Sequence, residues 1–134
     1  MKKSKRAGFT LVELLTVIAI IALLAALILG LASNAQKKAA RSRAEAEVGQ
    51  LESFVTDYQM KYGQVPVDAP ALAAALVAAN HSLTNASNAA DMPMDPWGMT
   101  YLYEPSSRVT FYLWSQGGDL TGGTPALWIG NPKP

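Results

Sequence analysis

One run of apolar residues constrains this chain more than any other feature. Positions 9–32 hold 24 residues of which only Glu13 is charged, and four basic side chains lie between positions 2 and 6. As a helix rising ~1.5 Å per residue, the run is roughly 36 Å long, which exceeds the ~30 Å hydrocarbon core of a bilayer. We therefore predict a membrane-crossing helix whose basic end is held in the cytoplasm by the positive-inside rule.

The single carboxylate in this run calls for an explanation. On insertion scales an acidic side chain costs about 2.5–3.5 kcal/mol at the middle of a membrane, and less near its surface. In one interpretation Glu13 lies shallow and only reaches the lipid headgroups. We favour the other interpretation, in which a cationic partner neutralises Glu13.

The basic stretch is followed by the segment Gly8-Phe-Thr-Leu-Val-Glu-Leu-Leu. This segment resembles the processing site of type IV pilins and type II secretion pseudopilins, in which a membrane peptidase cuts after the glycine and methylates the new amino terminus. The resemblance implies that residues 1–8 are a cleaved basic leader, that the cut separates Gly8 from Phe9, and that Phe9 is methylated. Glu13 is then the fifth residue of the mature chain, with a role in assembly.

The order of these parts differs from that of an ordinary secretory signal peptide. In such a peptide the apolar region precedes an Ala-x-Ala-like cut and is discarded. Here the implied cut precedes the apolar region, so the helix stays with the product. Glycine suits the cut, because without a Cβ the backbone can approach a protease closely.

Composition limits what else the chain can be. Its 134 residues have room for one domain and one membrane helix. Without residues 1–8 the chain carries seven basic and ten acidic residues, a formal charge of −3, so we expect no binding to nucleic acid. The chain has no cysteine, whereas many adhesive type IV pilins close a C-terminal loop with a disulfide. The resemblance therefore leans toward pseudopilins.

Residues 33–63 are predicted to continue the first helix as an amphipathic segment. They contain no proline, and apolar side chains recur at every third or fourth position, which marks one helical face. This stripe consists of Val48, Leu51, Val55, Tyr58 and Tyr62. Gly63 is placed to end the helix.

Residues 64–134 are predicted to form a globular head with a β-hairpin and a C-terminal loop. The expected elements are a helix at 69–79, a polar loop at 80–91, hairpin strands at 100–104 and 108–115, and a third short strand at 126–129. The predicted fold class is α+β, with the long N-terminal helix packed on a small antiparallel sheet. The resemblance implies the same architecture, the type IV pilin-like fold.

Two motifs in the head resemble those of major pseudopilins. Tyr62-Gly-Gln-Val-Pro stands where that subfamily has a Tyr-Gly-x-Tyr-Pro turn, with Val65 in place of the aromatic residue. Asp95-Pro-Trp-Gly-Met-Thr-Tyr-Leu-Tyr resembles its Asp-Pro-Trp-Gly-x-x-Tyr-x-Tyr pattern. These motifs place the chain closest to the major pseudopilin of type II secretion systems.

The resemblance also implies a calcium ion in the loop after the hairpin. Asp119 matches the first aspartate that binds Ca²⁺ in major pseudopilins, and the carbonyl groups of Ser115 and Gly118 are the expected additional ligands. No aspartate or glutamate follows Asp119, although Ca²⁺ takes about 6–8 oxygen ligands. The alternative is that Asp119 only caps the turn.

The remaining candidates favour structural roles. His81, the only histidine, lies in a polar loop, and Trp97, Trp114 and Trp128 are expected to supply buried area to the head. The sequence has no Ser/His/Asp set and no phosphate-binding loop, so we do not expect an enzyme.

The expected function is that of a structural subunit of the type II secretion pseudopilus, a helical filament of identical chains that helps drive protein export. The resemblance implies four kinds of partner: further copies of the chain, the prepilin peptidase, minor pseudopilins and an inner-membrane assembly platform. It implies a single pass through the bacterial inner membrane, with the leader cytoplasmic and the head and filament periplasmic. Two alternatives are a type IV pilin for adhesion, motility or DNA uptake, and a membrane-anchored binding module that never polymerises.

Overall fold

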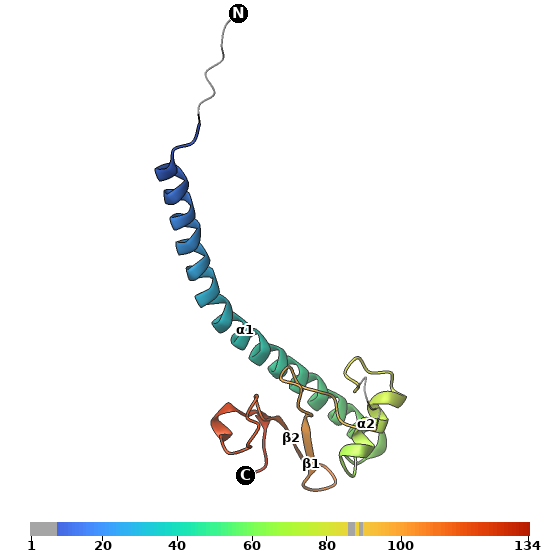
Figure 1. The fold of residues 1–134 in the computed structure, drawn as a ribbon. Coiled ribbons are helices and arrows are strands. Elements are labelled where there is room, and N and C mark those ends of the chain that lie inside the picture. The colour runs from blue at the N-terminus through green and yellow to red at the C-terminus, as the bar shows by residue number, and fades with distance from the viewer. Residues whose placement is uncertain (1–7, 86–87, 89) are drawn as a thin grey trace, which may run out of the picture. The chain divides into compact units, whose positions relative to one another are not determined.

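The computed structural model describes residues 8–85, 88 and 90–134 (Figure 1). The chain divides into two compact units, Met1–Lys37 and Lys38–Pro134, and each is described here by itself. Most of the predicted leader, residues 1–7, lies outside the described residues, as do positions 86, 87 and 89 of the predicted polar loop.

Helix α1 spans Leu11–Tyr62, 52 residues, and so begins two positions later than the predicted apolar run. The delay arises because Thr10 serves as the residue before the first helical turn: its hydroxyl accepts a hydrogen bond from the Glu13 backbone N–H at 3.2 Å. The helix ends as predicted at Gly63, whose φ of 74° is left-handed and whose N–H bonds to the Gln59 carbonyl at 2.7 Å.

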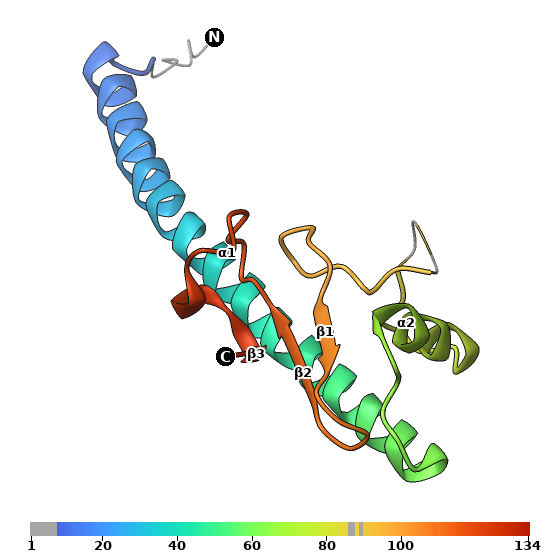
Figure 2. The same ribbon diagram turned by 90° about the horizontal axis from the view of Figure 1, so that it is seen from below.

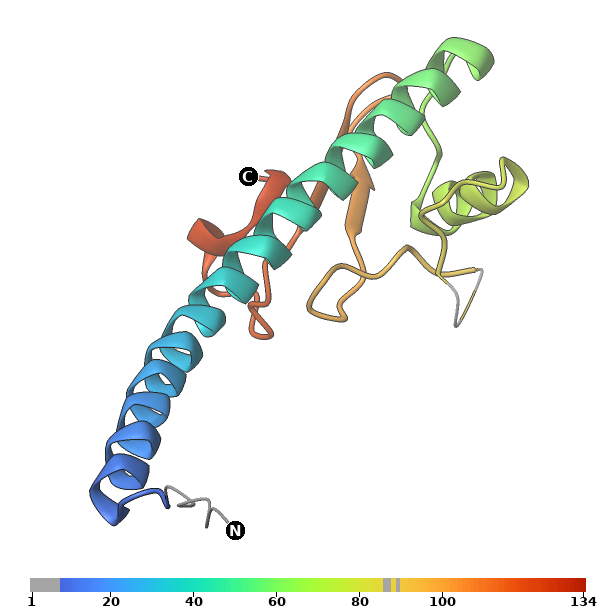
Figure 3. The same ribbon diagram turned by 90° about the horizontal axis from the view of Figure 1, so that it is seen from above.

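The second unit is the head. Besides the end of α1 it contains α2 (Ala69–Ala78), β1 (Leu102–Pro105), β2 (Phe111–Ser115), the short 3₁₀ helix η1 (Pro125–Leu127) and β3 (Ile129–Asn131). The strands form one antiparallel sheet in the order β1-β2-β3. The sheet lies alongside the second half of α1, and α2 lies beside β1, at the opposite edge from β3 (Figures 2 and 3). The predicted α+β fold class is confirmed.

Helix α2 (Ala69–Ala78) agrees with the helix predicted at 69–79, because the residues that start it are neighbours in the sequence. Asp68 precedes it, and one oxygen of its carboxylate accepts a hydrogen bond from the Ala71 N–H at 2.8 Å. Pro70 stands in the first turn, where a helix needs no N–H.

The hairpin lies where the sequence predicts it, but its paired strands are shorter than predicted. Pairing runs from Leu102 opposite Trp114 to Pro105 opposite Phe111, so residues 106–110 belong to the turn. The predicted third strand at 126–129 is wrong by three residues, because Pro125–Leu127 coils into η1 and pairing begins at Ile129. Pro125 has no N–H for a ladder and is preset for the first turn of a helix.

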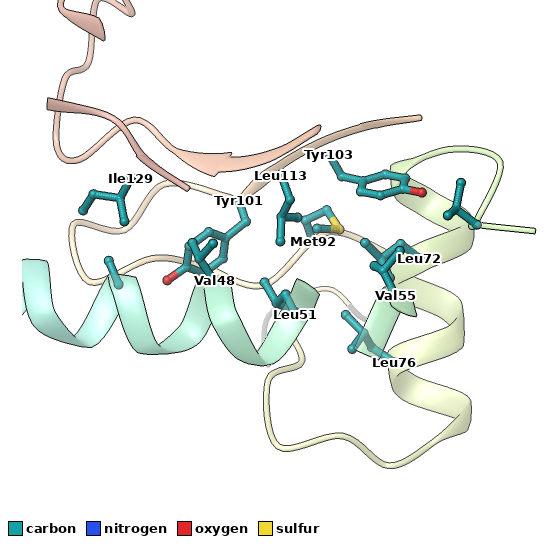
Figure 4. Packing of buried hydrophobic residues seen from close by; sticks show 12 residues of the cluster. Val48, Leu51, Val55, Leu72, Leu76, Met92, Tyr101, Tyr103, Leu113 and Ile129 are labelled. Atoms are coloured by element: carbon teal, nitrogen blue, oxygen red, sulfur yellow. The ribbon is translucent and has the colours of Figure 1, made fainter. Parts of the chain in front are cut away.

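One hydrophobic core lies between α1, α2 and the sheet (Figure 4). From the predicted stripe, Val48, Leu51 and Val55 are buried, whereas Tyr58 is half-buried and Tyr62 is 57% exposed. The buried face instead extends toward the N-terminus as far as Ala44. Strand β3 lies against this face, because a Cβ added at Gly130 would be 3.0 Å from Cγ1 of Val48. Figure 4 shows Ile129 of β3 facing α1 on the N-terminal side of Val48, where the buried face extends beyond the predicted stripe. Each fully buried leucine or valine contributes about 1.5–3 kcal/mol.

The same core contains a buried carboxylate. Glu47 on α1 is only 7% exposed; its Oε2 accepts a hydrogen bond from the Tyr101 hydroxyl at 2.6 Å, and its Oε1 accepts one from the Arg43 Nε at 2.6 Å. Burial, together with the bond to Glu47, raises the pKa of Tyr101, so that the hydroxyl keeps its proton and donates. The negative charge of Glu47 is thereby paired within the head, and this pairing offsets much of the cost of removing the carboxylate from water.

This pairing gives a first prediction. Tyr101→Phe lowers the free energy of unfolding by about 1.5–3 kcal/mol, because the lost hydrogen bond reaches a buried charged group. Urea unfolding of the full chain in detergent, followed by the fluorescence of the head tryptophans, measures the change.

The matched control is Tyr103→Phe. The Tyr103 hydroxyl donates to the neutral Pro66 carbonyl at 2.8 Å, so this substitution costs only about 0.5–1.5 kcal/mol. Equal losses for the two variants would show that the charge of Glu47 adds nothing.

Candidate assembly site

The first half of α1 exposes apolar side chains on every face. The large apolar residues between positions 9 and 29 are 46–84% exposed. Among the described residues α1 is the one helix long and apolar enough to cross a membrane; its most apolar window has a mean hydropathy of 3.0, and none of that window is buried by the chain itself. An apolar surface of this extent marks contact with lipid or with other proteins.

The carboxylate of Glu13 is held at the start of this surface by Thr10. Its Oε2 accepts hydrogen bonds from the Thr10 backbone N–H at 2.8 Å and from the Thr10 hydroxyl at 2.9 Å. The Thr10 hydroxyl in turn accepts from the Glu13 N–H at 3.2 Å. These reciprocal bonds form a capping box, which satisfies backbone donors that the first turn of a helix leaves open.

The cut expected from the sequence, between Gly8 and Phe9, would leave this arrangement intact. The capping box uses the N–H of Thr10, which would remain an ordinary amide, whereas the nitrogen of Phe9 would become an ammonium. Within the described residues Glu13 forms no ion pair, and its Oε1 accepts no hydrogen bond. One oxygen of the carboxylate therefore has no hydrogen-bond partner among the described residues.

The residues around the expected cut are open to a protease. Gly8, Phe9 and Thr10 precede α1 and have no regular secondary structure, and Phe9 is 84% exposed. A Cβ added at Gly8 would meet nothing within 4 Å among the described residues. The described part of the fold therefore does not explain the glycine at this position.

Thr10 is the residue that the sequence analysis missed. The pattern Thr-x-x-Glu at positions 10–13, directly before an apolar run, is the local signal of a capping box and was sufficient to find it.

In the head, the residues expected to bind calcium lie at the start of the loop between β2 and β3. The Oδ1 of Asp119 accepts hydrogen bonds from the Thr121 hydroxyl at 2.7 Å and the Thr121 N–H at 3.1 Å, and its Oδ2 accepts one from the Thr124 N–H at 2.6 Å. Ser115 is fully buried and donates its hydroxyl proton to Asp95 at 2.6 Å.

This donor set does not fit a calcium ion. A carboxylate has about four lone-pair positions, and three of those on Asp119 already accept bonds from the chain. The described residues contain no group of three or more His, Cys, Asp or Glu side chains that could hold a metal. The calcium site at Asp119, Ser115 and Gly118 stays a prediction, and the geometry of the loop gives it no support.

The bonds to Asp119 give a prediction about acid stability. Hydrogen bonds from the Thr121 hydroxyl and the Thr124 N–H hold the pKa of the Asp119 carboxyl below its ordinary value. Stability from a lowered pKa is present above the unfolded pKa, about 3.9, and is lost as pH falls through the folded pKa. The difference in melting temperature between wild type and Asp119→Asn is therefore constant near neutral pH and shrinks below about pH 4.

Thermal unfolding of the two proteins across a series of acidic buffers measures this difference. Other carboxyl groups titrate in both proteins and cancel in the comparison. A difference that stays constant through the acid range would contradict the assigned bonds.

The remaining candidates have structural contacts. The Nδ1 atom of His81 accepts a hydrogen bond from the Leu83 N–H at 3.0 Å, and its ring meets Phe54 edge-on with centroids 5.3 Å apart. Trp97 packs against the core, and Trp114 and Trp128 stack with centroids 6.2 Å apart. These contacts agree with the structural roles expected from the sequence.

Comparisons with known proteins identify the family. Residues 32–128 match the family described as type II secretion system protein G, and residues 3–29 match the prokaryotic N-terminal methylation motif. Similar curated proteins include the type II secretion system core protein G of Escherichia coli (strain K12), 32% identical over 130 residues that cover 90% of this chain and 87% of the relative. No solved structure matches the chain.

Two further relatives carry the same name. The protein from Klebsiella pneumoniae is 30% identical over 122 residues, which cover 86% of each chain. The protein from Pectobacterium carotovorum subsp. carotovorum is 29% identical over 126 residues, which cover 90% of this chain and 81% of the relative. All are named as components of a secretion system and none as an enzyme.

Proposed function

Because the chain belongs to the protein G family of type II secretion systems and is a structural subunit of the pseudopilus, we propose that it assembles through a charge pair between chains. In this pair the Phe9 ammonium of one subunit, exposed by removal of residues 1–8, meets Glu13 of the adjacent subunit. Methylation of Phe9 leaves the nitrogen basic, so the charge remains.

The proposal rests on the carboxylate of Glu13, of which only one oxygen accepts hydrogen bonds among the described residues. Thr10 fixes one oxygen at the end of the apolar helix, and the other oxygen is left open. Two unit charges about 4 Å apart attract by about 4 kcal/mol at an effective dielectric constant near 20. Leaving either charge buried and unpaired is costly, so the pair favours one axial register between neighbouring helices.

The exposed apolar surface supplies the remaining contact area. In the membrane, lipid covers the side chains of residues 9–29; in a filament, the helices of other copies cover them. The contact joins different surfaces of the two copies, because the end of one helix meets the flank of the next. Such contacts propagate as an open helix and do not close into a ring.

The apolar helix anchors the subunit in a membrane, and the subunit works with other components of the type II secretion system. In our proposal the leader faces the cytoplasm, where the prepilin peptidase removes it, and the head lies in the periplasm. An inner-membrane assembly platform and minor pseudopilins then guide the subunit from the membrane into a periplasmic filament.

The alternatives are less well supported. A type IV pilin is not favoured, since the family match covers residues 32–128 of the chain and names the secretion system. A binding module that never polymerises would leave 14 large apolar side chains between positions 9 and 29 with lipid as their only contact. It would also give Glu13 no role beyond its capping box with Thr10.

The proposal predicts a separation between processing and assembly. Glu13→Ala and Glu13→Val are cleaved like the wild type, because Glu13 lies past the cut, but they form few or no filaments. Filament yield after mild shearing, together with intact mass, measures both steps. Glu13→Gln is the matched control: it retains a side-chain acceptor for the Thr10 N–H and lacks the charge.

Assembly of Glu13→Gln at the wild-type level would reject the charge pair. Failure of Glu13→Gln together with Glu13→Ala supports it.

A second prediction concerns the leader. Replacement of Gly8 by a bulky residue such as leucine blocks removal of residues 1–8, although a Cβ at Gly8 would meet no atom of the described residues within 4 Å. Mass spectrometry then finds the full-length mass, whereas the wild type shows the loss of residues 1–8 and the gain of one methyl group. Detection of Phe9 as the terminus of Gly8→Leu would reject the assigned cut.

A further inference from the structure

We propose that the head fastens its C-terminal loop with a metal-free clasp of hydrogen bonds around Asp119, so that its folding does not depend on calcium. The clasp consists of Asp119, Thr121 and Thr124. The inference concerns the stability of the head and does not rest on the proposed mode of assembly.

The clasp closes the segment that leads from β2 to β3, drawn in red-orange in Figure 2. Asp119 is 8% exposed, and its two carboxylate oxygens accept three bonds of 2.6–3.1 Å from the Thr121 hydroxyl, the Thr121 N–H and the Thr124 N–H. The backbone adds two bonds, from the Asp119 N–H to the Gln116 carbonyl at 3.1 Å and from the Gly122 N–H to the Asp119 carbonyl at 3.2 Å. The negative charge is therefore compensated by dipoles of the loop itself.

These donors work against a cation at the same position. Each N–H or O–H directs its positive end at the carboxylate, so a metal ion there would meet three positive dipoles and would have to displace them. Hard cations such as Ca²⁺ also require several oxygen ligands, usually including more than one carboxylate. No acidic residue follows Asp119 in the sequence.

The carboxylate of Asp95, which bonds to Ser115 at the end of β2, is also occupied. Oδ1 of Asp95 accepts from the Trp97 N–H at 3.0 Å and the Met99 N–H at 2.9 Å, and its Oδ2 accepts from the Ser115 hydroxyl at 2.6 Å. Asp95 thus ties the Asp-Pro-Trp-Gly turn to the end of β2, and it has no oxygen without a partner.

The start of the loop is fixed by packing. Gly118 has a φ of 84°, and a Cβ at this position would lie 2.8 Å from Cδ1 of Trp97, so the indole ring rests directly on the glycine backbone. With the start of the loop fixed by Trp97 and its later part by the clasp, Ile129 is brought opposite Ser115 in the sheet. Hydrogen bonding and packing therefore fix the conformation of this loop, as a metal ion or a disulfide does in other loops.

Thermal unfolding of the full chain in detergent micelles, with calcium, with magnesium and with a chelator, tests calcium dependence. A folded-state site occupied at about 100 times its dissociation constant would raise the melting temperature by on the order of 10 °C for a head of this size. We expect the same melting temperature in all three conditions. A rise specific to calcium would overturn the proposal and support a calcium site at Asp119.

Two variants at one position test the clasp itself. Thr121→Val keeps the shape of the side chain and removes the hydroxyl, and we expect it to lower the melting temperature by several degrees. Thr121→Ser keeps the hydroxyl, and we expect it to melt close to the wild type. Equal melting of Thr121→Val and Thr121→Ser would overturn the clasp even if calcium has no effect.

Discussion

The rest of the molecule depends on the exposed apolar surface at its N-terminal end. The side chains of residues 9–29 are apolar on all sides, and no part of the most apolar window is covered by the chain itself. Lipid or other copies must cover this surface, since apolar area of this extent is not stable in water. An apolar surface alone fixes neither the direction of a helix nor its register against a neighbouring helix. In our proposal the polar contact at Glu13 fixes both.

In our proposal the contact at Glu13 depends on Thr10, which positions the carboxylate. The capping box satisfies donors at the start of α1 and holds the carboxylate close in sequence to Phe9, the proposed new amino terminus. A side chain ordered within its own helix loses less entropy when a partner arrives. The proposed processing event and the proposed assembly contact thus lie within about one turn of helix of each other, away from the head.

In the head, several acidic side chains are buried and hydrogen-bonded within the chain. Glu47, Asp95 and Asp119 are all largely buried, and each carboxylate accepts at least two bonds from named donors. Buried carboxylates that are satisfied in this way place the elements that they join, because a shifted partner would leave a charge unpaired. Glu47 joins α1 to the sheet, Asp95 joins a turn to β2, and Asp119 closes the loop before β3.

The sequence by itself determined the features whose cause is local. The long helix, its end at Gly63, the helix at 69–79 and the hairpin all follow from the spacing of apolar residues, from glycine and from proline. The fold class followed from these elements, and the family resemblance at Gly8, Phe9 and Glu13 pointed to a pilin-like subunit.

Only the tertiary structure decided which atoms the remaining side chains meet. The extension of the buried stripe to Ala44 depends on where β3 lies against α1, and the exposure of Tyr62 shows that the head does not cover the last turn of that helix. The bonding of Asp119 likewise depends on a loop geometry that spacing does not reveal. The physical reason is the same in each case: burial and hydrogen-bond partners arise from contacts between segments distant in the chain, whereas helix caps and turns are set within a few residues.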